Sequence, residues 1–165
     1  MRKRDLVQSK RIVVTGGAGY LGSVLSQRIL SSGYELVVAD SLVNGGGPIL
    51  GIYTDDNFTF HQVDVRDIPM SIFHEADAVV HLAAIVGDPA CAREPDLATD
   101  VNLRSALAVF NLCQTLSVKR FIFASTCSNY GKMLDPTELV TEDTELGPVS
   151  LYAETKVAVE RALLD

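Results

Sequence analysis

The sequence predicts an α/β protein with a doubly wound parallel sheet. Short apolar runs alternate with stretches of helical periodicity along the chain of 165 residues. The apolar runs contain few polar residues, as expected for strands that are buried on both faces. Strands separated by helices pair in parallel, and right-handed crossovers then produce the doubly wound arrangement. The length suits a single domain with a substantial core.

Each predicted element has its own local signal. Apolar runs bounded by turn residues predict strands at 11–16, 34–40, 58–65, 77–84 and 119–126. Helical spacing of apolar residues predicts helices at 20–33, 68–76, about 95–116 and 150–165. Stretches rich in Gly, Pro and polar residues predict loops at 41–51 and 136–148. We expect residues 1–9 to be a flexible leader and residues 10–165 to form the domain.

The composition excludes several classes of function. A formal net charge of −7 argues against a general nucleic-acid surface and against binding to anionic membranes. The three cysteines have no CxxC spacing and the three histidines are not clustered with them, so no metal site is expected. Free thiols, together with the lack of a signal peptide or membrane-length segment, predict a cytoplasmic protein.

A glycine-rich turn joins the first predicted strand to the first helix. It reads TGGAGYLG at 15–22, with glycines at 16, 17, 19 and 22. Glycines allow a tight turn and a close backbone approach to a pyrophosphate, and the N–H groups at the helix start face the phosphates. The strand–turn–helix context favours a dinucleotide site over a plain turn, which is the alternative.

Asp40 strengthens the dinucleotide prediction. It ends the second predicted strand, 18 residues after Gly22. A carboxylate at this place accepts hydrogen bonds from the adenosine ribose hydroxyls and repels a 2′-phosphate, so NAD is favoured over NADP. The alternative is a solvated strand end.

Tyr152 and Lys156 form a second chemical motif. They lie four residues apart in the last predicted helix, and therefore on one face of it. We expect the Lys156 ammonium to lie near the Tyr152 hydroxyl and to lower its pKa, which would make Tyr152 a usable base. The alternative is an ordinary exposed helix face.

Taken together, the motifs resemble the short-chain dehydrogenase/reductase superfamily, in its extended NAD-dependent epimerase/dehydratase branch. The matching segments occur in the family's order over almost the whole chain. They are TGGAGYLG at 15–22, Asp40, VDVRD at 63–67, HLAA at 81–84, Asn102, FIFASTCSNYG at 121–131 and YAETK at 152–156. The resemblance implies a Rossmann-type NAD-binding domain.

The resemblance also implies roles for individual residues. The cofactor-binding residues would be Gly16, Gly19, Tyr20, Leu21 and Gly22 at the pyrophosphate, Asp40 at the ribose, Asp64 and Val65 at the adenine, and Leu82, Ala83, Ala84 and Asn102 along the cofactor. Thr126 would hydrogen-bond the substrate, Tyr152 would shuttle the proton, and Lys156 would bind the nicotinamide ribose and tune Tyr152.

The segment STCSNYG at 125–131 narrows the reaction within this branch. Related dehydratases carry Asp and Glu where this chain has Cys127 and Ser128, so dehydration is disfavoured. Epimerisation of a nucleotide-sugar, or a simple NAD(H)-dependent dehydrogenase or reductase reaction, remains. Cys127 is a possible acid/base group, but a small residue beside the site is the simpler interpretation.

The resemblance implies structural elements beyond those that these 165 residues supply. Extended members have further strands and a C-terminal lobe that binds the nucleotide-sugar, so we expect this chain to be an N-terminal portion. A cofactor-binding module without turnover is therefore an alternative function. A homodimer is also expected, with the helices near 95–116 and from Ser150 packing against their copies through Val157, Val159 and Leu163.

Overall fold

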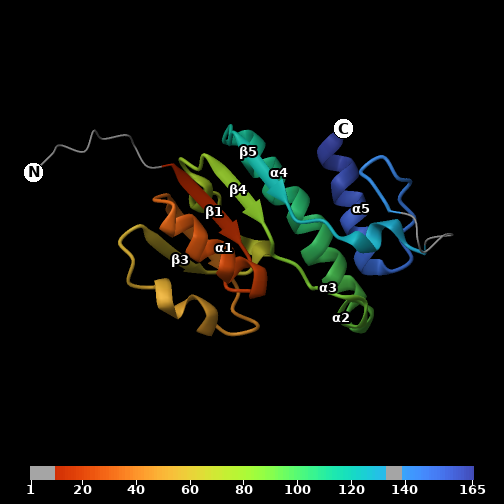
Figure 1. The fold of residues 1–165 in the computed structure, drawn as a ribbon, viewed down its shortest axis with the longest axis horizontal. Coiled ribbons are helices and arrows are strands. Elements are labelled where there is room, and N and C mark those ends of the chain that lie inside the picture. Colours follow the sequence, from red (N-terminus) through yellow and green to blue (C-terminus); the bar gives the residue numbers. More distant parts are fainter. Residues whose placement is uncertain (1–9, 133–138) are drawn as a thin grey trace, which may run out of the picture.

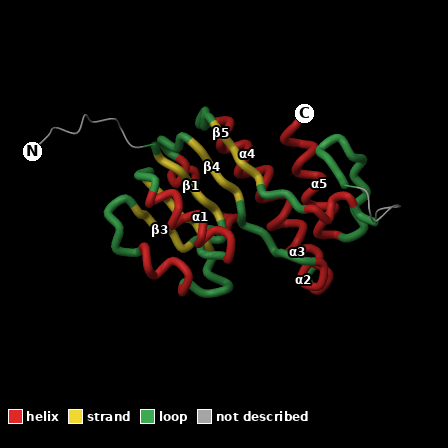
Figure 2. The backbone as a smooth tube through the Cα atoms, viewed as in Figure 1, coloured by secondary structure: helices red, strands yellow, loops and turns green. Residues whose placement is uncertain are grey.

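The computed structural model describes residues 10–132 and 139–165 of the chain. Five strands form one parallel sheet in the order β3-β2-β1-β4-β5. Their bounds are Arg11–Thr15 (β1), Glu35–Asp40 (β2), Phe58–Gln62 (β3), Ala78–His81 (β4) and Arg120–Phe123 (β5). This order confirms the predicted doubly wound sheet, with the topological switch between β1 and β4 (Figures 1 and 2).

Helices cover both faces of the sheet. On one face lie α1 (Tyr20–Ser31) and the 3₁₀ turn η1 (Gly47–Ile52). Their apolar side chains pack against the central strands, where Val14, Leu36 and Val38 are completely buried. Because the central strands bury both faces, the residues between their polar ends are apolar, IVV in β1 and LVVA in β2.

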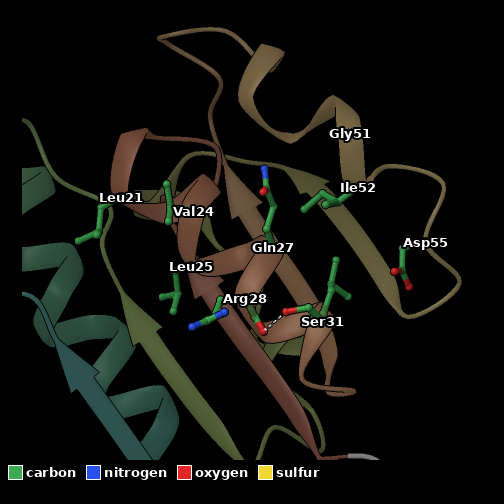
Figure 3. A pocket seen from close by; sticks show the side chains of 10 residues that line it. Leu21, Val24, Leu25, Gln27, Arg28, Ser31, Gly51, Ile52 and Asp55 are labelled. Carbon is green, nitrogen blue, oxygen red and sulfur yellow. Dashed lines mark hydrogen bonds between the residues drawn. The ribbon is translucent and has the colours of Figure 1, made fainter.

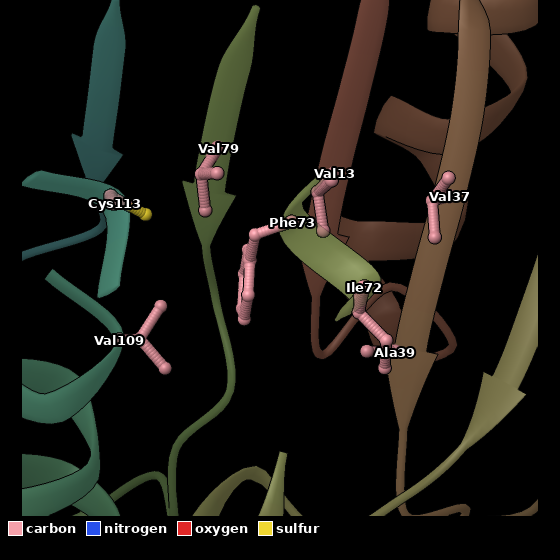
Figure 4. Close-up of a cluster of buried hydrophobic side chains, with 8 residues drawn as sticks. All are labelled: Val13, Val37, Ala39, Ile72, Phe73, Val79, Val109 and Cys113. Atoms are coloured by element: carbon pink, nitrogen blue, oxygen red, sulfur yellow. The ribbon is translucent and has the colours of Figure 1, made fainter. Parts of the chain in front are cut away.

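The opposite face packs against α4 (Ser105–Thr115) and the 3₁₀ turn η3 (Met70–Phe73). Phe73 lies at the centre of this cluster and is 0% exposed (Figure 4). The side chains drawn in Figure 4 are Val13, Val37, Ala39, Ile72, Phe73, Val79, Val109 and Cys113. This cluster holds the crossover from β3 to β4 and the helix after β4 against the same face.

The predicted helix at 95–116 is interrupted. It consists of α3 (Pro95–Thr99), a π-helical turn η4 (Asp100–Arg104) and α4. A further short helix, α2 (Asp88–Arg93), begins at Asp88 after Gly87 and has Pro89 as its second residue; this helix was not predicted from the sequence. The helix predicted at 68–76 is only the turn η3, and strand β3 ends at Gln62, before the turn η2 (Val65–Asp67).

The last helix, α5 (Leu151–Leu164), begins where the Ser150 side chain accepts a hydrogen bond from Ala153 N–H. It contacts α2, α3, η4, α4 and the 3₁₀ turn η5 (Cys127–Tyr130), and Figure 1 shows α2, α3 and α5 gathered at one end of the molecule. The leader at 1–9 and part of the loop at 136–148 lie outside the described residues. No helix among the described residues is long and apolar enough to span a membrane.

Candidate functional site

The predicted site residues follow the carboxyl ends of the strands. All five strands are parallel, so these ends share one edge of the sheet. Gly16 follows β1, Asp40 ends β2, Leu82 follows β4 and Thr126 lies three residues after β5. This edge of an open α/β sheet is where ligands bind, in the crevice beside the switch point.

The glycine turn is too close-packed for side chains. A Cβ on Gly22 would lie 2.4 Å from the Gly16 carbonyl oxygen, and one on Gly16 would lie 2.6 Å from the Ala83 nitrogen. Gly16 also has a φ of +74°, which side-chain-bearing residues rarely adopt. The glycines therefore bring the start of α1 down onto β1 and onto the segment that follows β4.

The N-terminus of α1 lies directly after this turn. Gly19 is its N-cap residue and supplies no side-chain cap. Tyr20 and Leu21 are the first two helical residues, and their side chains are 93% and 59% exposed. The first N–H groups of a helix have no partner within the helix and favour an anion, so this turn has the composition and geometry of a phosphate cradle.

Asp40 is tied to the glycine turn. Its Oδ2 accepts a hydrogen bond from Ala18 N–H (3.0 Å), and its Oδ1 accepts one from Leu42 N–H (2.8 Å). The side chain is half-buried at the end of β2. Each carboxylate oxygen has a second lone pair, so Asp40 can hold the turn and still accept hydrogen bonds from a ligand.

Asp64 and Val65 lie beyond the end of β3. The carboxylate of Asp64 pairs with Arg66, with 2.7 Å between Oδ2 and Nη2. Hydrogen bonding to Arg66 lowers the pKa of Asp64. Asp64 is also the N-cap of η2, because its Oδ1 accepts a hydrogen bond from Arg66 N–H (2.9 Å), and Val65 packs against the core cluster on the α4 face.

Asn102 fixes the segment after β4. Its Oδ1 accepts from Ile85 N–H (2.8 Å), and its Nδ2 donates to Ile85 O (2.9 Å). Asn102 lies in the π-helical turn and is 1% exposed. It thereby holds the chain that follows Leu82, Ala83 and Ala84 through both backbone polar groups of Ile85.

Tyr152 is half-buried near the start of α5, and Thr126 contributes to its electrostatic environment. Burial raises the pKa of Tyr152, and hydrogen bonding to the Thr126 side chain opposes that rise. Thr126 is half-buried and caps η5, its hydroxyl accepting from Ser128 N–H (3.2 Å). The structure thus brings together two of the three predicted catalytic side chains.

Lys156 reaches the same segment from one turn further along α5. Its Nζ donates to Ala124 O (2.9 Å) and lies 4.6 Å from the centroid of the Phe123 ring. Burial lowers the pKa of Lys156 from 10.5 to about 8. A buried ammonium of this kind remains charged at neutral pH while being easier to deprotonate than an exposed one.

The expected effect of Lys156 on Tyr152 is not present. The Nζ lies 5.9 Å from the centroid of the Tyr152 ring, and the pKa of Tyr152 is raised rather than lowered. The prediction of a lowered pKa was wrong because burial is the larger influence and Lys156 is bonded to a backbone carbonyl.

His81, the last residue of β4, is a packing residue. It is completely buried, lies 2.9 Å from Thr15 Oγ1 through Nδ1, and stacks with Phe121 and Phe123. Burial lowers its pKa to about 3, with a smaller contribution from the Lys156 charge. Its ring is therefore neutral at physiological pH and links the end of β4 to that of β5.

Sequence reasoning missed a group of polar residues behind Thr126. Glu160 accepts hydrogen bonds from the side chains of Ser125 and Asn129, each at 2.8 Å. The available signal was the position of Glu160, four residues after Lys156 and therefore on the same face of α5. Its partners could not be read from the sequence because Asn129 lies 31 residues away.

The cysteines do not form a metal centre. Cys91 and Cys113 are buried and Cys127 is exposed. Across residues 10–132 and 139–165, no group of three His, Cys, Asp or Glu side chains is arranged to hold a metal ion.

An open groove of about 1000 Å³ lies between α1 and η1 (Figure 3). Apolar side chains such as Val24, Leu25 and Ile52 line it, with Arg28 and Asp55 among the polar ones. Leu21 is shared with the predicted cofactor site, whereas Thr126, Tyr152 and Lys156 do not contribute to the groove. The groove is therefore separate from the catalytic side chains.

The prediction that Val157 and Val159 contribute to a homodimer interface was wrong. Val157 and Val159 are 3% and 0% exposed within a single chain, so they are not available to a second copy. Helix α5 instead packs on α2, α3, η4 and α4 of its own chain. Leu163 is half-buried.

Comparison with known proteins gives consistent matches. The model of the NAD dependent epimerase/dehydratase family matches residues 12–165. The UDP-glucose 4-epimerase of Bacillus subtilis is 34% identical over 161 residues, covering 93% of this chain and 47% of that protein. The UDP-glucose 4-epimerase of Neisseria meningitidis serogroup C is 34% identical over 165 residues, covering 94% and 48%.

Solved structures match over the same region. The UDP-N-acetylglucosamine 4-epimerase of Methanobrevibacter ruminantium, in complex with UDP-N-acetylmuramic acid, has a TM-score of 0.88 and 29% identity, covering 96% of this chain and 50% of that one. The Thermus thermophilus UDP-glucose 4-epimerase, in complex with NAD, has a TM-score of 0.81 and 31% identity, covering 93% and 50%. The chain thus spans about half the length of the relatives it matches.

Proposed function

The chain belongs to the NAD-dependent epimerase/dehydratase family, and on that premise we propose that it binds NAD and acts in the 4-epimerisation of a nucleotide-sugar. The observation that carries the proposal is that Thr126 and the helix of Tyr152 and Lys156 lie at the same sheet edge as the glycine turn, where Lys156 Nζ donates to Ala124 O. Relatives that are UDP-glucose 4-epimerases, and matching structures with NAD, support the choice of reaction and cofactor.

The residues present fit NAD. The pyrophosphate needs free backbone N–H groups and no intruding side chain. The first N–H groups of α1 would provide the donors, and the turn of Gly16, Gly19 and Gly22 leaves the space clear of side chains. Tyr20 and Leu21 flank this turn, and Asp40 would accept hydrogen bonds from the ribose hydroxyls. Asp64 and Val65 would border the adenine, while Leu82, Ala83 and Ala84, held by Asn102, would line the path of the cofactor.

Bound NAD would supply the hydride chemistry, accepting a hydride from the sugar carbon and returning it to the opposite face. Tyr152 would take the hydroxyl proton of that carbon on its phenolic oxygen and later return it. Thr126 would hydrogen-bond the same sugar oxygen. Because burial raises the pKa of Tyr152, the phenolate that could take up this proton is disfavoured. The positive charge of Lys156, with its Nζ 5.9 Å from the centroid of the Tyr152 ring, would favour that phenolate.

Product analysis with UDP-glucose tests the proposed reaction. Purified chain with a catalytic amount of NAD should convert UDP-glucose to UDP-galactose, detected by proton NMR. The absorbance at 340 nm should not increase, because no NADH accumulates. Steady growth of that absorbance would instead indicate the alternative, a dehydrogenase. Neither product, with NADH still bound, would indicate a cofactor-binding module without turnover and would contradict the epimerase proposal for this chain.

The homodimer also remains a proposal. Val157 and Val159 cannot form its interface, so the exposed faces of α4 and α5 would have to do so. Sedimentation at high and low concentration tests it, and a monomer throughout would exclude self-association of this chain.

A further inference from the structure

Three polar side chains stand in a row on one face of α5. Tyr152, Lys156 and Glu160 are four residues apart, so they stack along the helix. Each one contacts the segment that follows β5. Lys156 donates a hydrogen bond to Ala124 O, and Glu160 accepts hydrogen bonds from Ser125 and Asn129. Thr126 contributes to the electrostatic environment of Tyr152. The proposed catalytic pair thus has a third member on the same face.

Glu160 closes a three-way hydrogen-bond network. Its Oε2 accepts from Ser125 Oγ and from Asn129 Nδ2, each at 2.8 Å. The Asn129 amide also donates to Ser125 Oγ at 2.8 Å. Asn129 is 2% exposed, and its Oδ1 has no hydrogen-bond partner among the described residues. The amide is therefore held through its Nδ2 alone, and removing Glu160 would take away one of its two acceptors.

Two members of the network, Ser125 and Asn129, lie on either side of Thr126 along the chain. Ser125 precedes Thr126, and Asn129 closes the 3₁₀ turn that Thr126 caps, its N–H donating to Thr126 O at 3.3 Å. Both flanks of Thr126 are thereby tied to α5, the helix that carries Tyr152. The distance between the Thr126 and Tyr152 hydroxyls then depends on these ties.

We infer that Glu160 is a positioning residue, which holds the 125–129 segment so that the Thr126 hydroxyl stays against Tyr152. The inference rests on the proposed function for its catalytic consequence. It acts through hydrogen bonds to a carboxylate oxygen, and so a carboxamide oxygen at the same place should substitute for it. A role based on the negative charge would not survive that replacement.

Three variants separate these possibilities. Glu160→Ala removes the acceptor, Glu160→Gln keeps one acceptor oxygen, and Glu154→Ala removes an exposed carboxylate from the same helix as a control. Hydrogen exchange of amides 127–131, read by mass spectrometry, reports the segment directly. We expect Glu160→Ala to speed this exchange by about tenfold, as loss of a hydrogen bond to a charged group implies. Glu160→Gln and Glu154→Ala should exchange like the unaltered chain.

Turnover provides the second readout. Glu160→Ala should lower kcat for UDP-glucose epimerisation by about tenfold or more, with the Kd for NADH unchanged, and Glu160→Gln should restore it. Equal exchange in Glu160→Ala and Glu154→Ala would overturn the inference, as would a Gln variant as impaired as the Ala variant. If Glu160→Ala does not fold, Ser125→Ala should show the same changes at smaller size, and no change there would also overturn it.

Failure of the proposed function gives a different pattern. If the unaltered chain shows no turnover, while exchange at 127–131 is fast in Glu160→Ala and slow in Glu160→Gln, the epimerase proposal fails and the positioning of Thr126 stands. If turnover is present and unaffected by Glu160→Ala, the epimerase proposal stands and the positioning role of Glu160 fails.

Discussion

Lys156 donates a hydrogen bond from Nζ to the carbonyl oxygen of Ala124, across 2.9 Å. The contact joins the helix that carries Tyr152 to the segment that carries Thr126, two residues after Ala124. Lys156 is only 2% exposed to solvent, so its ammonium group is a buried cation. The consequences of that burial can be measured.

Replacing Lys156 by Met should change how stability depends on pH. The pKa of Lys156 is about 8 when folded, against 10.5 as the ordinary value, so the unfolded chain binds this proton more tightly. The free energy of unfolding should therefore rise between pH 8 and 10.5, by up to about 3 kcal/mol from this group. Urea denaturation across this range should show the rise in the unaltered chain and its loss in Lys156→Met. Lys132→Met, at an exposed lysine, should keep this rise. If the free energy of unfolding depends on pH in the same way in the unaltered chain and both variants, the buried ammonium is contradicted.

Gly22→Ala should destabilise the fold and abolish NADH binding. The added Cβ would lie 2.4 Å from the Gly16 carbonyl oxygen and 2.6 Å from the Gly17 Cα, and backbone atoms cannot move aside cheaply. Overpacking of this kind costs about 1–3 kcal/mol or more. Gly51→Ala is the matched control, because a Cβ there meets nothing within 4 Å. Thermal unfolding of both proteins checks the difference, and equal midpoints would count against the close packing.

Asp40→Asn should reduce the preference for NADH over NADPH. The substitution removes the charge that would repel a 2′-phosphate and weakens the acceptor offered to the ribose. We expect the ratio of the two Kd values to fall by about tenfold, which corresponds to about 1.4 kcal/mol. Asp56→Asn removes the same charge at an exposed position away from the turn and should leave the ratio unchanged. A ratio that is the same in both variants would remove Asp40 from the discriminating role.

Tyr152→Phe should abolish turnover without affecting cofactor binding. The hydroxyl is the only group lost, and the ring keeps its packing, so the substitution removes proton transfer and the hydrogen bonding of that hydroxyl. A loss of about 100-fold or more in kcat is expected for a general acid/base. Tyr53→Phe, at a side chain that is 57% exposed, serves as the control. Turnover within a few fold of the unaltered chain would exclude Tyr152 as the proton shuttle.

Thiol reactivity should distinguish the three cysteines. Cys127 is exposed beside Thr126, whereas Cys91 and Cys113 are buried. Burial raises the pKa of both buried thiols, for Cys113 to about 11, which further suppresses the reactive thiolate. A chromogenic disulfide reagent should therefore label one thiol per folded chain and all three after unfolding. Rapid reaction of the folded Cys127→Ser variant would contradict this assignment.

The sequence was sufficient for features that depend on local chemistry. Strands β1, β2 and β4 are apolar runs, and the glycines at 16–22 leave few alternatives to a tight strand-to-helix turn. The position of Asp40 at the end of β2 followed from the same pattern. These predictions needed no knowledge of contacts between distant parts of the chain.

Features that depend on long-range contacts were not accessible. The π-helical turn contains Asn102, whose side chain reaches Ile85 seventeen residues away. The raised pKa of Tyr152 reflects burial by the fold, and helical spacing alone pointed in the opposite direction. Likewise, Val157 and Val159 are apolar residues of the kind found at interfaces, but other parts of the same chain bury them.

Titration of the purified chain with NADH and with NADPH tests the central claim most directly. The sequence contains no Trp, so nicotinamide fluorescence can be followed over a low protein background. We predict saturable NADH binding and NADPH binding at least about tenfold weaker, because the proposed place of Asp40 at the ribose would bring its carboxylate against a 2′-phosphate. A chain that is folded by circular dichroism but binds neither nucleotide, or binds both equally, would contradict an NAD site at the glycine turn.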